Sequence, residues 1–230
     1  MSRFIEFIIA VTKVVVFLRN TAKGILDSTR KILISLLKRF AAYWRKPISA
    51  GVRLISTNIC VSGTRIKRII IASMLSAFAA IMQSAGALGG PGFIISSLVT
   101  LPVALAAILS IPTGAAAYSV TLFLLVILQP SEIIVFPFTT GLLGLGIGLG
   151  LKLFKTRAAV IAFAALCLTM GISFLLYILR FPVLGPISPS GFSFIASAAI
   201  YTFSYLYSWL WTEIGMIALK FLDKAIVKAS

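Results

Sequence analysis

The chain has 230 residues, of which 60% are hydrophobic and only 11% are charged, and its formal net charge is +16 at pH 7. With a mean hydropathy of +1.10, this composition excludes an ordinary soluble domain and indicates an integral membrane protein. Histidine is absent, which excludes Ser-His-Asp triads and histidine-ligated metal sites.

Residues 1–68 form a basic segment. They hold fourteen of the 21 Lys and Arg residues and only two acids, Glu6 and Asp27. Residues 4–18 are too short to span a bilayer comfortably, contain Glu6 and Lys13, and lack a small-residue cleavage site. We therefore expect neither a membrane span nor a cleaved signal peptide here.

Residues 25–44 have the pattern of an amphipathic helix, with Asp27, Lys31, Ser35 and Lys38 on the polar face. Such a helix lies along anionic lipid headgroups at the membrane surface. Docking onto a cytoplasmic partner and nucleic-acid binding are the alternatives, and the apolar half of the surface argues against the second. The apolar face consists of Ile25, Leu26, Ile32, Leu33, Leu36, Leu37, Phe40 and Trp44.

Six transmembrane helices are expected after this segment. Between Ile69 and Leu151 the only charged residue is Glu132, and a charge at the bilayer centre costs about 2.5–3.5 kcal/mol on insertion scales. The long apolar runs are typical of helices rather than of β-barrel strands. Pro, Gly and charged residues divide the region into spans at 69–88, 93–111, 114–128, 133–151, 158–179 and 192–211.

The distribution of Lys and Arg predicts the orientation. Most basic residues fall in loops on one side of the six spans, and Lys/Arg-rich loops stay in the cytoplasm. We therefore expect an all-α, multi-pass protein of the cell membrane with both termini cytoplasmic. It would comprise a basic amphipathic segment at 1–68, a six-helix bundle at 69–211 and a basic tail at 212–230.

The fourth expected span contains five glycines between Gly141 and Gly150. Their spacing does not match the Gly-x-Gly-x-x-Gly fingerprint of a dinucleotide-binding loop. Gly144 and Gly148 lie four residues apart, as do Gly146 and Gly150, so each pair occupies one helical face. The pattern favours close packing against neighbouring helices.

The sixth expected span carries one candidate ligand-binding face. Hydroxyl and aromatic side chains recur there at three- and four-residue spacing, so they could line a pocket. Hydrogen bonding between helices is the alternative explanation. The face consists of Ser197, Tyr201, Ser204, Tyr205 and Ser208.

Glu132 and Arg180 are the only charged residues on the predicted outer side of the bundle. We expect them to bind opposite charges of a zwitterionic ligand or to pair with each other. Alternatively, both side chains extend to the lipid headgroups.

Enzymatic activity is not expected. The five acidic residues do not cluster, which leaves no paired-carboxylate or di-metal site, and no cofactor is expected. The positions of Cys60 and Cys167 argue against a disulfide between them, and Cys167 is most simply a small core residue.

Two stretches between residues 68 and 152 are rich in small residues, and the second also contains prolines. They are "RIIIASMLSAFAA", with small residues at Ala72, Ser76 and Ala80, and "LPVALAAILSIPTGAAAY" around Pro102, Pro112 and Gly114. In these stretches, residues 68–152 resemble the substrate-binding S components of energy-coupling factor transporters. In that family an Ala-x-x-x-Ala-type surface on the first helix contacts the energising subunit. Ordinary intramolecular packing would also explain these small residues. The long basic N-terminal segment departs from the family's usual pattern.

The resemblance implies that the protein binds a vitamin-like micronutrient near its outer face and delivers it inward by toppling in the membrane. A transmembrane coupling subunit and separate ATPase subunits would be its partners, since the chain has no Gly-x-x-x-x-Gly-Lys-Ser/Thr sequence. The alternative is a scaffold that recruits cytoplasmic partners through its basic arm, similar in its helical core to the rod-shape membrane protein family.

Overall fold

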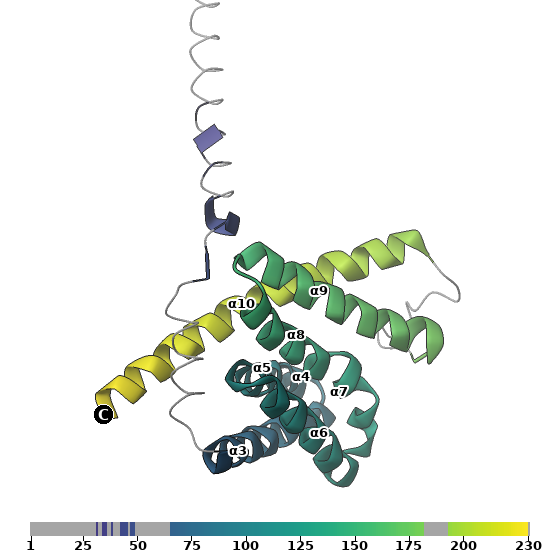
Figure 1. Ribbon diagram of the computed structural model, residues 1–230. Helices are drawn as coiled ribbons and strands as arrows, with labels where there is room; N and C mark the ends of the chain where they lie inside the picture. The colour runs from purple at the N-terminus through teal and green to yellow at the C-terminus, as the bar shows by residue number, and fades with distance from the viewer. Residues whose placement is uncertain are drawn as a thin grey trace, which may run out of the picture. The chain divides into compact units, whose positions relative to one another are not determined.

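The structure is a computed structural model that describes residues 31, 34, 35, 38, 42–45, 47, 48, 65–181 and 193–229 (Figure 1). The chain divides into two units, Met1–Lys46 and Pro47–Ser230. In the described ranges the backbone is almost entirely helical and forms no strand beyond an isolated bridge between Pro47 and Thr156. The expected all-α class is therefore confirmed for this part of the chain.

The described residues of the first unit are helical. Lys31, Ile34, Ser35 and Lys38 are exposed. Most of the predicted amphipathic helix at 25–44, together with Glu6, Asp27 and Cys60, lies outside the described residues. Its binding to lipid stays a prediction.

The second unit contains the helical body. Its first half consists of α3 (Arg65–Ser84), η1 (Ala85–Leu88), α4 (Gly90–Ser97), α5 (Thr100–Leu109) and α6 (Ile111–Leu128). Its second half consists of η2 (Pro130–Ile133), α7 (Val135–Phe138), α8 (Thr140–Leu153), α9 (Arg157–Ser173), η3 (Phe174–Ile178) and α10 (Phe194–Ala229).

Five helical stretches in the described ranges are long and apolar enough to cross a membrane, which fits a multi-pass membrane protein. Most of the sixth expected span lies in α10, which is not among the five, because hydroxyl and tyrosine side chains lower its mean hydropathy. Six spans therefore stay a prediction. The five stretches are Ile66–Leu88, Gly90–Leu109, Ile111–Leu128, Pro130–Leu153 and Arg157–Ile178.

Prolines divide two of the expected spans into shorter helices. The span expected at 93–111 is interrupted between α4 and α5, because Pro102 has no N–H to donate to the carbonyl of Leu98. Leu101 N donates to Leu98 O instead, at 3.0 Å. The span expected at 133–151 is divided into η2, α7 and α8, with Pro137 inside α7.

The expected close packing of the α8 glycines is confirmed. A Cβ added at Gly144 would lie 2.8 Å from Val103 Cβ, and one at Gly148 would collide with Ala107 of α5. On the other face, an added Cβ at Gly146 would lie 3.3 Å from Cys167 Cβ of α9. α8 is therefore held between α5 and α9 at backbone distance.

The helices of the second unit pack closely against their neighbours (Figure 1). α3 packs against α6, α8 packs against both α5 and α9, and α9 also packs against α10. Apolar side chains fill the space between the helices, among them Phe136, Leu143 and Ile147, which are fully buried.

Candidate functional site

A cavity of about 860 Å³ lies at one end of the second unit. We call it the Glu132 cavity. Its walls come from the end of α3, from α4, η2, α7, α8 and α9, and from the first turns of α10. It is lined by Gln83, Phe93, Ser96, Ser97, Glu132, Val135, Thr139, Thr140, Leu168, Ile172, Phe181, Ala196, Ala199, Ile200, Phe203 and Tyr207.

Three polar side chains form a continuous hydrogen-bonded chain in the cavity wall. Thr140 Oγ1 donates to Gln83 Oε1 at 3.0 Å, and Gln83 Nε2 donates to Glu132 Oε2 at 2.8 Å. Gln83 is only 1% exposed, so both of its bonds are shielded from competing solvent. The chain fixes the carboxylate of Glu132 in the wall.

Local backbone structure places these three groups together. Gln83 lies in the last turn of α3, Pro130 begins the turn η2 that carries Glu132, and Thr140 is the first residue of α8. Gly86 makes room for the carboxylate, because a Cβ added there would lie 3.0 Å from Glu132 Oε1. The site depends on turns far apart in the sequence.

The remaining wall is mainly apolar and aromatic. The rings of Phe203 and Tyr207 stack, with centroids 5.4 Å apart. Two further rings line the wall: Phe93 of α4, and Phe181, the last residue of the described range 65–181. Among the described lining residues, Glu132 is the only one that carries a formal charge. The cavity thus combines one carboxylate with a large apolar surface.

The predicted face of α10 does not line this cavity. Ser204 and Ser208 are fully buried, and their hydroxyls have no hydrogen-bond partner in the described ranges. Ser197 Oγ donates to Ser193 O at 3.0 Å, while Tyr201 is 41% exposed and Tyr205 is partly exposed. A ligand-binding role for this face stays a prediction.

The cavity is lined instead by the adjacent face of α10, whose residues mostly lie one position before those of the predicted face. That face consists of Ala196, Ala199, Ile200, Phe203 and Tyr207. It carries fewer hydroxyls than the predicted face, so the spacing of polar residues does not identify it as a cavity lining.

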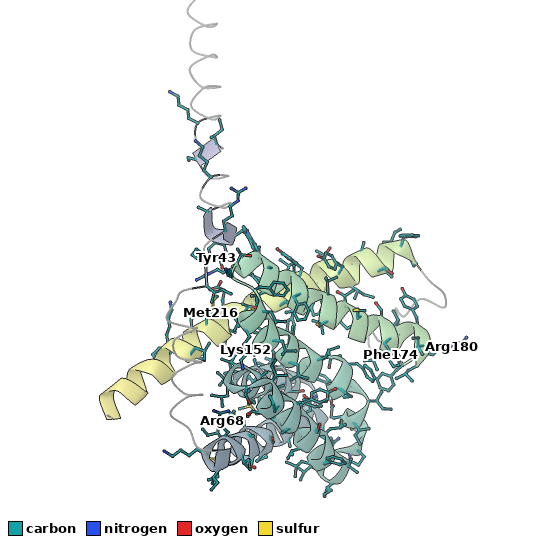
Figure 2. All side chains as sticks on the ribbon, viewed as in Figure 1. Tyr43, Arg68, Lys152, Phe174, Arg180 and Met216 are labelled. Atoms are coloured by element: carbon teal, nitrogen blue, oxygen red, sulfur yellow. The ribbon has the colours of Figure 1, made fainter. Side chains whose placement is uncertain are left out.

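Glu132 lines the cavity as expected for a ligand contact, but Arg180 does not. Arg180 is exposed and has a φ of 50°, a left-handed backbone conformation. Figure 2 shows it at the edge of the helical body beyond Phe174. Glu132 and Arg180 form no ion pair with each other in this arrangement, whereas Arg157 and Glu213 do.

A groove of about 710 Å³ lies near the opposite end of α3 and is called the α3/α6 groove. Two of the three predicted partner-contact residues, Ala72 and Ser76, belong to its lining. Figure 2 labels Arg68, which lies at the same end of α3. The lining consists of Arg68, Ile69, Ala72, Ser73, Ser76, Ser110, Pro112, Thr113, Ala116 and Val120.

The small residues at the base of the groove pack within the protein. Ser76 Oγ donates to Ala72 O at 2.7 Å and to Ala117 O of α6 at 3.2 Å. Ser76 and Ala80 are fully buried, and Ala72 is 7% exposed. Exposed surface at the groove comes from neighbours such as Ser73 and Ala116, so a partner docking here would touch those first.

Gln83 is the residue that the sequence analysis missed. Its signal was a single amide side chain within an apolar span, since a polar group buried in a membrane helix needs a partner.

No group of three or more Cys, Asp or Glu residues that could hold a metal ion occurs in the described ranges. Comparisons with protein-family models, with curated proteins and with solved structures find no match to the chain.

Proposed function

We propose that the protein is the membrane-embedded, substrate-binding subunit of a transporter for a vitamin-like micronutrient, and that the Glu132 cavity holds the ligand. The observation that carries the proposal is the cavity itself. Its volume of about 860 Å³ falls in the range of about 300–1,000 Å³ typical of small-molecule sites. Its mainly apolar wall with a few converging polar groups is also typical of such sites.

The two hollows of the second unit support two separate roles, ligand binding in the Glu132 cavity and partner docking at the α3/α6 groove. The Glu132 cavity uses Gln83 near the C-terminal end of α3, whereas the α3/α6 groove uses residues from Arg68 to Ser76 near its N-terminal end. In the orientation expected from the basic loops, the cavity faces outward and the groove faces the cytoplasm. The groove is then the proposed contact for a transmembrane coupling subunit linked to separate ATPase subunits.

Filling the cavity tests the ligand site. Ala199 lines the cavity, whereas the adjacent Ala198 does not, and both are exposed. Ala199→Trp should therefore abolish the co-purification of a small molecule, detected by mass spectrometry of the denatured protein, and Ala198→Trp should leave it unchanged. Equal recovery from both variants would remove the cavity from ligand binding.

Obstructing the groove tests the partner site. Ala116→Trp should reduce co-purification of other membrane subunits from the native host while leaving the small molecule bound. Ala77→Trp is the matched control, because Ala77 is exposed on α3 but lines neither hollow. Complexes of equal yield from both variants would exclude the groove as the docking site.

The scaffold alternative is favoured by the charge of the N-terminal segment, which holds fourteen of the 21 Lys and Arg residues within its 68 positions. Deleting residues 1–46, the first unit, separates the two functions. A transport subunit should keep its ligand after this deletion. A scaffold should lose its cytoplasmic partners, and neither the full chain nor the deletion variant should retain a small molecule.

A further inference from the structure

The charge balance of the Glu132 cavity is one-sided. Glu132 is its one charged lining residue within the described ranges, and no Lys or Arg of those ranges lines the cavity. Arg180 precedes the lining residue Phe181 but forms no ion pair with Glu132. Lys152 lies in the last turn of α8, at the opposite end of that helix from Thr140. The carboxylate therefore has no cationic partner from this part of the chain.

The hydrogen bonds around Glu132 come from neutral groups. The Thr140 hydroxyl donates to Gln83 Oε1, and Gln83 Nε2 donates to Glu132 Oε2. A carboxylate that lies in a mainly apolar wall is costly unless a counter-charge approaches it.

The other carboxylate oxygen has capacity for a ligand. Glu132 Oε1 lies against Gly86, and no hydrogen bond to this oxygen occurs in the described ranges. An ionised carboxylate accepts about four hydrogen bonds through its two oxygens. A ligand ammonium placed in the cavity could donate to Oε1 while its body rests against Phe93 and Phe203.

We propose that the Glu132 cavity selects organic cations, with a protonated amine bound to Glu132 and an aromatic or alkyl body in the apolar wall. This assignment rests on the proposed function and narrows its ligand class. Carboxylate and phosphate ligands are disfavoured, because they would place a second negative charge beside Glu132 with no cation among the described lining residues to offset it.

Three compounds with one scaffold test the charge. Tryptamine carries an ammonium group, tryptophol replaces it with a neutral hydroxyl, and indole-3-propionate carries a carboxylate. Calorimetric titration of the full-length purified protein should show tryptamine binding about ten- to a hundredfold tighter than tryptophol, the range expected for a hydrogen bond to a charged group. Indole-3-propionate should bind more weakly than either.

Two variants assign the preference to Glu132. Glu132→Gln should weaken tryptamine binding to the level of tryptophol and leave tryptophol unchanged. Gly86→Ala keeps the charge but presses a methyl group against Oε1, so it should reduce tryptamine binding as well. Gly90→Ala is the matched control, because a Cβ added at Gly90 meets nothing within 4 Å.

The results separate the ligand class from the ligand site. If indole-3-propionate binds as tightly as tryptamine, or if Glu132→Gln leaves their ratio unchanged, the cation assignment is overturned. It is also overturned if wild-type protein binds none of the three compounds. In each case, a co-purified molecule that Ala199→Trp removes and Ala198→Trp retains would still support the cavity as a ligand site.

Aminophospholipids offer the same ammonium chemistry from the membrane. Tryptamine titrations should therefore be repeated in nanodiscs of phosphatidylglycerol alone and in nanodiscs that contain phosphatidylethanolamine. Equal affinity in both indicates that a soluble amine is the ligand. Weaker tryptamine binding in phosphatidylethanolamine, with the difference lost in Glu132→Gln, identifies the lipid headgroup as the cation and retains the assignment.

Discussion

At the scale of single residues, Gln83 determines where the polar groups of the cavity point. Its amide joins the first residue of α8 to the turn that carries Glu132, through bonds of 3.0 Å and 2.8 Å. Both ends of the amide are used, so an aliphatic side chain of similar length cannot replace it.

Replacing Gln83 with Leu should lower the free energy of unfolding by about 1–3 kcal/mol, because Thr140 and Glu132 lose their buried partner. Thermal unfolding of the detergent-solubilised protein measures the loss. Gln129→Leu is the control, since Gln129 donates to Ser131 in an exposed turn, and it should change stability little. Equal melting temperatures for the two variants would contradict a structural role for the Gln83 chain.

At the scale of helices, α8 shows how glycine position decides packing. Gly148 faces the backbone of α5, whereas Gly146 faces the side chain of Cys167 on α9. A backbone cannot move aside as a side chain can, so the same substitution has different costs on the two faces.

Gly148→Ala should therefore destabilise the protein by about 1–3 kcal/mol, the usual cost of overpacking. Gly146→Ala should be nearly neutral, because the helix-forming advantage of Ala over Gly, about 1 kcal/mol, offsets a small shift of Cys167. Size-exclusion chromatography after heating measures how much of each variant keeps the elution volume of the unheated protein, and that fraction ranks the two variants. The reverse order would place α9, rather than α5, at the closer approach to α8.

The sequence predicted this helix packing but did not indicate which face of α10 lines the cavity. Glycine spacing reports directly on which faces admit a close neighbour, and the two pairs in α8 were assigned correctly. The lining of the cavity depends on how α10 is rotated about its axis. The hydroxyl groups of Ser204 and Ser208 do not indicate this rotation, because a buried hydroxyl can face either a cavity or a neighbouring helix. The spans expected at 93–111 and 133–151 are divided into shorter helices near Pro102 and Pro137. Hydropathy did not predict these interruptions, because it does not depend on whether a residue has a backbone N–H.

At the scale of the whole second unit, ionic and backbone contacts hold the end opposite the cavity. Arg157 Nη1 and Glu213 Oε1 lie 2.7 Å apart and join α9 to α10, with side chains 15% and 27% exposed. At the same end, Ile48 N donates to Lys155 O at 2.9 Å. These contacts join the α8–α9 turn to segments that precede and follow it.

Reversing either charge of the pair should destabilise this end. Arg157→Glu and Glu213→Arg should each cost about 1–2 kcal/mol, because each leaves two like charges facing one another in a partly buried position. The double variant should recover at least half of that loss, which a double-mutant cycle of melting temperatures would measure. Additive losses in the double variant would show that the pair contributes no coupling.

The buried hydroxyls of α10 also have a consequence for biogenesis. Ser204, Ser208 and Thr212 are fully buried in the folded unit and have no hydrogen-bond partners in its described ranges. α10 is also not among the five helical stretches of the described ranges that are long and apolar enough to cross a membrane. We expect it to partition poorly from the translocon into lipid on its own and to insert only as α9 covers its polar face. If α9 entered the bilayer before α10 had packed against it, α10 would then fail to insert and would stay in the cytoplasm.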